Sequence, residues 1–189
     1  MVVVSGPSGV GKDMLIRRIS NMDYSHHHVV TVTTRQIRDG ERDGEDYHFL
    51  SEADFRQMEG RGELLESAQV YGNWYGVPRP QIEQALDQGR DVLLKVDIQG
   101  AHTIKSRFPQ AVLVFLAPSS MEELRHRLVR RKTESGANLQ LRLKTAEREM
   151  KSWPSFDYIV INAEGELDSA VSEINAIITA EKCRVYQTG

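Results

Sequence analysis

The fold is decided by one stretch of the sequence, Ser5-Gly6-Pro7-Ser8-Gly9-Val10-Gly11-Lys12. It directly follows Val2-Val3-Val4, a short β-branched run that is typical of a buried parallel strand. Residues 14–19 after it carry apolar side chains at helical spacing. A strand, a glycine-rich loop and a helix in this order predict a phosphate-binding loop, which this context favours over an ordinary tight turn.

The loop has the composition that anion binding requires. Gly6, Gly9 and Gly11 can adopt backbone conformations that other residues avoid, so successive N–H groups can point inward at a phosphate. The positive end of the following helix supports the same anion. Lys12 adds a full charge for the outer phosphates of the ligand.

Two carboxylates near the loop are candidates for binding magnesium. Asp13 stands where such loops usually carry a serine or threonine whose hydroxyl binds the metal. A carboxylate there could bind magnesium directly or through a water, or it could merely complement the positive end of the helix. Asp97 ends the apolar run 92–96, where an acid commonly helps to hold magnesium. The alternative for Asp97 is that it caps the next helix.

The bulk composition describes an ordinary globular protein. The 189 residues suffice for one domain, with 40% hydrophobic and 27% charged residues. The net charge of −3 gives no support for nucleic-acid binding. The apolar runs are too short to span a membrane and no signal-like segment precedes the first strand, so we expect a cytoplasmic protein without a membrane partner. Cys183 is the only cysteine, which excludes an intrachain disulfide.

Apolar runs of strand length alternate with segments of helical spacing along the rest of the chain. This alternation predicts an α/β fold with a parallel sheet covered by helices on both faces. Met22–His28 is expected to be a polar connection, and its three adjacent histidines make a poor metal site because neighbours in an extended segment point to opposite faces. Further strands are expected at residues 29–32, 92–97, 111–116 and 157–162, and further helices at 53–58, 78–86, 101–108, 120–131, 139–150 and 167–183.

Two polar regions are candidates for contacting a second anionic group. Residues 33–49 are dense in charge and glycine, and Arg35, Arg38 and Tyr47 within them could form an anion clamp, although such runs are often only solvated loops. Residues 71–77 combine aromatic side chains with glycine and could form one wall of a base pocket. The arginine-rich helices near 120–131 and 139–150 have the charge that a lid over phosphates needs.

The chain resembles the guanylate kinases over nearly its whole length. The resemblance rests on residues 6–12, 33–35, 38, 40–41, 43–44, 46–49, 65–66, 72–76, 97–101, 127–128, 131, 142 and 157–162. It implies a P-loop NTPase-type parallel sheet core formed by residues 1–31, 79–119 and 149–189. It also implies a GMP-binding subdomain at 32–78 and a lid at 120–148.

The resemblance implies magnesium-dependent transfer of a phosphoryl group from ATP to GMP, giving ADP and GDP. It implies that the ATP phosphates bind to Gly6, Pro7, Ser8, Gly9, Val10, Gly11, Lys12 and Asp13. The implied GMP ligands are Arg35, Arg38, Tyr47 and Tyr75 for the phosphate and Glu66, Thr31 and Asp97 for the base. The residues implied to stabilise the transferring group are Lys12, Arg127, Arg131 and Arg142, and those implied to hold magnesium are Asp13 and Asp97.

The chemistry of Glu66 agrees with this assignment. Guanine presents two adjacent donors, N1–H and the 2-amino group, which one carboxylate can accept together. Adenine presents an acceptor at N1, so the same carboxylate would repel it. Phosphoryl transfer needs positioning and charge neutralisation more than a nucleophile, which fits a site of arginines, a lysine and a metal.

Three residues depart from the guanylate kinase pattern. Asp13 replaces the metal-binding hydroxyl, Val77 stands where a hydroxyl usually donates to the guanine O6, and Lys95 stands where an acidic residue often lies. The alternatives are a ribose 1,5-bisphosphate phosphokinase, which the loop aspartate and the Tyr75-Gly76-Val77 segment resemble, and a non-catalytic guanylate-kinase-like binding module. The intact loop argues against the module. We expect a monomer or a homodimer.

Overall fold

The computed structural model describes residues 1–22, 26–130 and 136–185. Its main sheet has five parallel strands in the order β2-β7-β1-β8-β9. These strands are β1 (Val2–Ser5), β2 (His26–His28), β7 (Asp91–Lys95), β8 (Val112–Ala117) and β9 (Tyr158–Ile161). β1 lies in the centre and all four of its residues are buried. A strand buried on both faces needs a continuous apolar run, which explains its valines.

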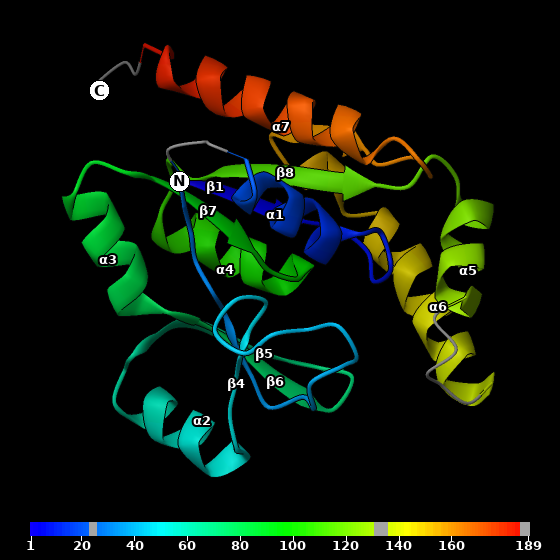
Figure 1. Cartoon of the computed structure of the whole chain (residues 1–189), viewed down its shortest axis with the longest axis horizontal. Helices are drawn as coiled ribbons and strands as arrows, with labels where there is room; N and C mark the ends of the chain where they lie inside the picture. The colour runs from blue at the N-terminus through cyan, green and yellow to red at the C-terminus, as the bar shows by residue number, and fades with distance from the viewer. Residues whose placement is uncertain (23–25, 131–135, 186–189) are drawn as a thin grey trace.

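Helices cover both faces of this sheet, and the alternation of β1 decides which residue meets which layer (Figure 1). Val2 and Val4 pack in one cluster with α1 (Lys12–Ser20) and α7 (Leu167–Lys182). Val3 points the other way, into a second cluster with α3 (Arg79–Asp87) and α4 (Ile98–Arg107). The expected α/β fold with a doubly covered parallel sheet is therefore confirmed.

A second, smaller sheet lies beside the main one and falls within residues 32–78 (Figure 1). Its order is β4-β3-β6-β5, with β3 antiparallel to β6, β6 antiparallel to β5, and β3 parallel to β4. Helix α2 (Glu52–Gly60) packs on it through the fully buried Phe55. The strands are β3 (Val32–Thr33), β4 (His48–Phe49), β5 (Leu64–Val70) and β6 (Asn73–Pro78).

Two helices lie side by side next to the phosphate-binding loop (Figure 1). α5 (Met121–Arg130) and α6 (Gly136–Met150) pack on the core through Leu124, Leu128 and Ala146. A short 3-10 turn, η1 (Trp153–Ser155), connects α6 to β9. No helix in the described ranges is long and apolar enough to cross a membrane.

The expected strand at residues 29–32 is wrong in its position. The structure places β2 earlier, at His26–His28, and starts β3 at Val32, so residues 29–31 connect the two sheets. The histidines form the edge of the main sheet, where they pair with residues 91–93 of β7 and are only partly buried. An edge strand needs no apolar run, which is why its composition looked like that of a connection.

Candidate functional site

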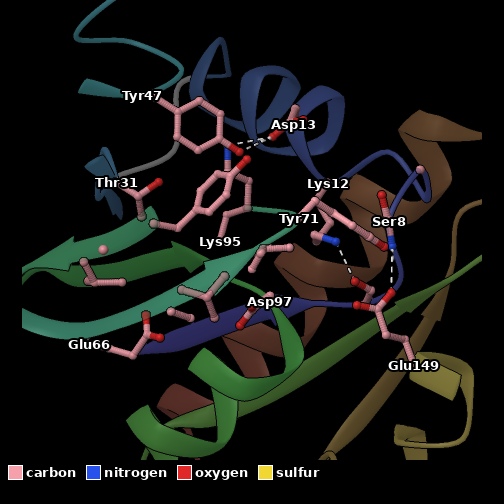
Figure 2. A pocket seen from close by; sticks show the side chains of 18 of the residues that line it. Ser8, Lys12, Asp13, Thr31, Tyr47, Glu66, Tyr71, Lys95, Asp97 and Glu149 are labelled. Atoms are coloured by element: carbon pink, nitrogen blue, oxygen red, sulfur yellow. Dashed lines mark hydrogen bonds and ion pairs between the residues drawn. The ribbon is translucent and has the colours of Figure 1, made fainter. Parts of the chain in front are cut away.

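A pocket opens where β1 and β7 end, between the phosphate-binding loop and the second sheet (Figure 2). It brings together residues that are far apart in the sequence. The predicted site residues that line it are Gly6, Ser8, Gly9, Gly11, Lys12, Asp13, Thr31, Arg38, Tyr47, Glu66, Tyr75, Asp97 and Arg142. Of the described site residues, Pro7, Val10, Arg35 and Arg127 do not line it.

Glycine is required at two positions of the loop by close backbone packing. A Cβ at Gly6, where φ is +144°, would lie 2.2 Å from the carbonyl oxygen of Leu116. A Cβ at Gly11, where φ is +103°, would lie 2.5 Å from Nδ2 of Asn162. Both conformations are strained for residues with a side chain. The loop therefore lies directly on the neighbouring strand ends.

Lys12 lies inside the loop that precedes it. Its Nζ donates to the carbonyl oxygens of Gly6 at 2.5 Å and Pro7 at 3.1 Å. Burial lowers the pKa of Lys12, while the nearby carboxylates of Glu149, Asp13 and Asp97 oppose this shift. The ammonium is thus held at the loop end of the pocket by groups that a phosphate oxygen could replace.

Arg127 does not lie over the pocket as the sequence prediction required. Its guanidinium donates to the carbonyl oxygens of Val10 at 2.9 Å and Asn162 at 2.7 Å, and it also pairs with Glu123. Asn162 supports the same Val10 oxygen through Nδ2 at 2.7 Å. These carbonyls lie behind the loop and need donors, so Arg127 fixes the loop from its far side.

Arg142 does reach the pocket from α6. It is 7% exposed, and its Nη2 donates to Oγ of Ser8 at 2.8 Å. Arg131, the third arginine predicted for this region, lies outside the described residues. Ser8 and Arg142 together tie α6 to the loop.

Glu66 lies at the opposite end of the pocket, on β5 (Figure 2). It is 6% exposed, and burial, helped by the charge of Asp97, raises its pKa to about 8. Thr31 and Val77 line the same end, so Val77 presents an apolar wall there. Asp97 also lines the pocket and caps α4, because its Oδ1 accepts from the N–H of Gly100 at 2.7 Å.

The predicted anion clamp is only partly assembled at the pocket. Arg38, Tyr47 and Tyr75 line it, with the two tyrosine rings 6.0 Å apart. Arg35 lies behind them and pairs with Glu41 at 2.9 Å, and these two side chains are only 10% and 12% exposed. Its guanidinium carbon lies 5.3 Å from the centre of the Tyr47 ring. Arg35 therefore supports Tyr47 and does not itself line the pocket.

Asp13 contacts a lysine and a tyrosine in the structure. Its Oδ1 accepts from Nζ of Lys95 at 2.7 Å and from the Tyr47 hydroxyl at 3.1 Å. Burial alone would lower the pKa of Lys95, but the charge of Asp13 and the contact with Tyr47 raise it, so the side chain is cationic. Two residues that depart from the guanylate kinase pattern thus form one ion pair.

Three lining residues with polar side chains were absent from the predicted site: Tyr71, Lys95 and Glu149. Glu149 on α6 accepts from the backbone N–H of Ser8 through Oε2 at 3.1 Å, and burial raises the pKa of this carboxyl. No local pattern distinguishes Glu149 from the exposed Glu147 of the same helix. Lys95 did have a signal, because it is the single charged residue in the apolar run 92–96.

A family model described as guanylate kinase matches residues 1–181. The guanylate kinase of Desulfitobacterium hafniense is 45% identical over 189 residues, which cover 98% of this chain and 92% of that protein. Guanylate kinase 2, chloroplastic/mitochondrial, of Oryza sativa subsp. japonica is also 45% identical, over 99% of this chain and 66% of that protein. The crystal structure of guanylate kinase from Anaplasma phagocytophilum superposes with a TM-score of 0.82 at 32% identity, covering 98% of this chain and 87% of that chain.

Proposed function

The chain belongs to the guanylate kinase family, and on this premise we propose that its pocket transfers a phosphoryl group from ATP to GMP, giving ADP and GDP. One observation carries this proposal. A glycine-rich loop with a half-buried lysine and a buried glutamate that can accept from guanine line the same pocket from opposite ends. Guanine presents N1–H and the 2-amino group side by side in one plane, which suits the single carboxylate of Glu66.

The loop end of the pocket is proposed to bind ATP. The backbone N–H groups of residues 6–11 and the start of α1 favour the phosphate chain, and Lys12 neutralises charge between the outer phosphates. Arg142 adds a second cation from α6, and Arg127 acts indirectly by fixing the loop at Val10. The protein therefore positions and neutralises the donor, which is most of what phosphoryl transfer requires.

The other end is proposed to bind GMP. Ionised Glu66 accepts the two donors of guanine, while Thr31 and Asp97 complete the base pocket. Arg38, Tyr47 and Tyr75 bind the phosphate and hold its oxygen toward the donor. Residues 32–78 would thereby act as the acceptor subdomain and residues 120–148 as the lid.

Magnesium is proposed to enter with the ATP phosphates. No group of three or more His, Cys, Asp or Glu side chains in the described ranges could hold a metal alone, which suits an ion that keeps its waters and needs only one or two carboxylates. Asp13 and Asp97 line the pocket and supply such oxygens. Because Oδ1 of Asp13 already accepts from Lys95 and Tyr47, we assign Asp13 to a metal-bound water. Bound magnesium would supply charge neutralisation at the phosphates.

The direct test of the reaction is product analysis. Purified protein is incubated with ATP, GMP and magnesium, and the nucleotides are separated by chromatography. The proposal expects ADP and GDP to form in equal amounts, and neither to form when GMP or magnesium is left out. Release of ADP and inorganic phosphate without GDP would contradict it.

Glu149→Gln is expected to tighten the binding of ATP several-fold. The carboxylate accepts from the N–H of Ser8, one of the donors that the loop would offer to a phosphate, and its charge repels that phosphate. An amide oxygen competes less strongly for the same donor. The dissociation constant of ATP, measured by titration calorimetry, checks this. Glu147→Gln on the same helix is the control, and weaker ATP binding in Glu149→Gln would contradict the prediction.

Gly100→Ala is expected to weaken GMP binding and leave ATP binding unchanged. A Cβ at Gly100 would lie 3.0 Å from Cδ and Oε2 of Glu66, so the carboxylate would have to shift by a few tenths of an ångström. A displaced carboxylate loses alignment with both guanine donors. Gly60→Ala is the matched control because nothing lies within 4 Å of a Cβ there. Equal GMP affinity in the two variants, measured by titration, would show that Glu66 tolerates the contact.

A further inference from the structure

We propose that Lys95 is a further substrate-binding residue, whose ammonium binds the phosphate of the acceptor nucleotide, and that Asp13 is the residue that positions it. This inference rests on the proposed function, because it takes the acceptor to be a nucleoside monophosphate. It deepens that function by adding a cation to the acceptor phosphate site.

The position of Lys95 is fixed by two elements other than its own strand (Figure 2). Lys95 ends β7 and lines the pocket, although its side chain is only 5% exposed. Its Nζ lies 2.7 Å from Oδ1 of Asp13 on α1 and 4.0 Å from the centre of the Tyr47 ring. The ammonium is thereby held between the start of α1 and the acceptor end of the pocket.

Lys95 can bind an anion without leaving Asp13. An ammonium has three donor hydrogens, and the contact with Oδ1 of Asp13 uses one of them. A buried ion pair costs desolvation free energy, and an apolar pair of the same volume is often as stable or more stable. Stability alone therefore gives little reason for a lysine at the wall of this pocket. Binding of a phosphate dianion by the ammonium would explain why a lysine stands at this position.

The acceptor phosphate is the ligand that the surroundings favour. Tyr47, which contacts both members of the pair, is one of the proposed phosphate ligands. Arg35 is engaged by Glu41 and does not line the pocket, which leaves Arg38 as the proposed guanidinium ligand. Arg38 and Lys95 together supply two positive charges, matching the charge of a phosphate monoester. Lys12 lies in the loop itself, on the donor side.

The competing explanation is that Lys95 merely neutralises Asp13. Asp13 would otherwise place an uncompensated carboxylate close to the phosphates of both nucleotides. The two explanations differ when both charges are removed together. If Lys95 contacts the phosphate, a variant that is neutral at both Lys95 and Asp13 still lacks a phosphate ligand and binds GMP weakly. If Lys95 only neutralises Asp13, GMP binding returns in that variant.

The experiment measures the dissociation constants of GMP and guanosine by titration calorimetry, without ATP or magnesium. Lys95→Met is expected to weaken GMP binding at least tenfold and leave guanosine binding unchanged, because guanosine lacks the phosphate. Asp13→Asn/Lys95→Met is expected to show the same loss of GMP affinity as Lys95→Met. It is expected to keep the fold, because neither substitution leaves the other residue as a buried unpaired charge. Asp13→Asn is expected to lower the ratio of GMP affinity to guanosine affinity in the protein that has Lys95. In the Lys95→Met background the same substitution is expected to leave this ratio unchanged. A merely structural role of Asp13 would not produce this dependence on Lys95. Lys105→Met is the control, since Lys105 pairs with Asp157 away from the pocket.

An unchanged ratio of GMP to guanosine affinity in Lys95→Met would overturn the proposal. Recovery of GMP binding in the double variant would overturn it as well, in favour of charge neutralisation. If the proposed function itself is wrong, the unaltered protein forms no GDP from ATP and GMP. That outcome is measured separately from the binding of GMP by the variants. Thermal unfolding of each variant identifies any that have lost the fold, and the double variant then decides.

Discussion

Glu66→Gln is expected to lower kcat/KM for GMP by about 10²- to 10³-fold and to leave ATP binding unchanged. Among the described residues that line the pocket, Glu66 is the buried one whose carboxylate can accept both donors of guanine together. Glutamine keeps the size but presents a donor to one of them, so a buried pairing with a charged acceptor is lost. Steady-state kinetics with GMP as the varied substrate measure the change. Glu63→Gln, at a partly exposed position just before β5, is the control.

The same substitution is expected to stabilise the free protein. Burial raises the pKa of Glu66 to about 8, above its ordinary value of 4.5, so between these pH values the folded state binds more protons than the unfolded state. The free energy of unfolding of the unaltered protein therefore falls as pH rises through this window, by up to about 1.4 kcal/mol per pH unit. Glutamine does not titrate, so the advantage of Glu66→Gln should grow from pH 5 to pH 8. Urea unfolding at both pH values checks it, and a constant difference would contradict it.

Lys12→Met is expected to abolish phosphoryl transfer, with a loss of about 10³-fold or more. The ammonium lies inside the loop. Its hydrogen-bond acceptors in the described part of the chain are the carbonyl oxygens of Gly6 and Pro7. Methionine fills a similar space but lacks the positive charge that contacts the transferring phosphoryl group. ADP release in the presence of GMP measures the effect. GMP binding should remain, because Lys12 lies at the donor end.

Retention of more than a tenth of the activity in Lys12→Met would show that another cation carries the role assigned to Lys12. Arg142 is the nearest such candidate on the donor side, since it contacts Ser8 of the same loop. Loss of GMP binding together with activity would instead show that the division into donor and acceptor ends is wrong. Lys144→Met on α6 serves as the control for removing one lysine.

Most of the fold could be predicted because its signals are local. The apolar run of β1, the glycine-rich loop and the helix after it lie within twenty residues, and their order allows few other structures. The edge strand at His26–His28 could not be predicted, since its residues are polar and its pairing with β7 bridges more than sixty residues. The cap that Asp97 provides to α4 is also a local signal, because the accepting carboxylate and the donating N–H lie three residues apart.

Most of the polar residues that line the pocket were predictable from the sequence as a set, but their arrangement was less predictable. Arg127 and Arg35 were predicted as phosphate ligands because arginine commonly binds phosphate. In the structure each contacts protein groups behind the pocket, which only folding brings together. Asp13 and Lys95 were each recognisable as departures from the guanylate kinase pattern. That they form one ion pair depends on the parallel packing of β7 beside β1, which no local pattern encodes.

The choice of acceptor tests the account most directly. Release of ADP from ATP is measured by a coupled assay with the unaltered protein and, in turn, GMP, AMP and ribose 1,5-bisphosphate as acceptors. The account predicts rapid turnover with GMP and turnover lower by orders of magnitude with the other two, because AMP presents an acceptor at N1 to Glu66 and the ribose bisphosphate has no base to fill that end of the pocket. Equal turnover of GMP and AMP, or preference for the ribose bisphosphate, would contradict it.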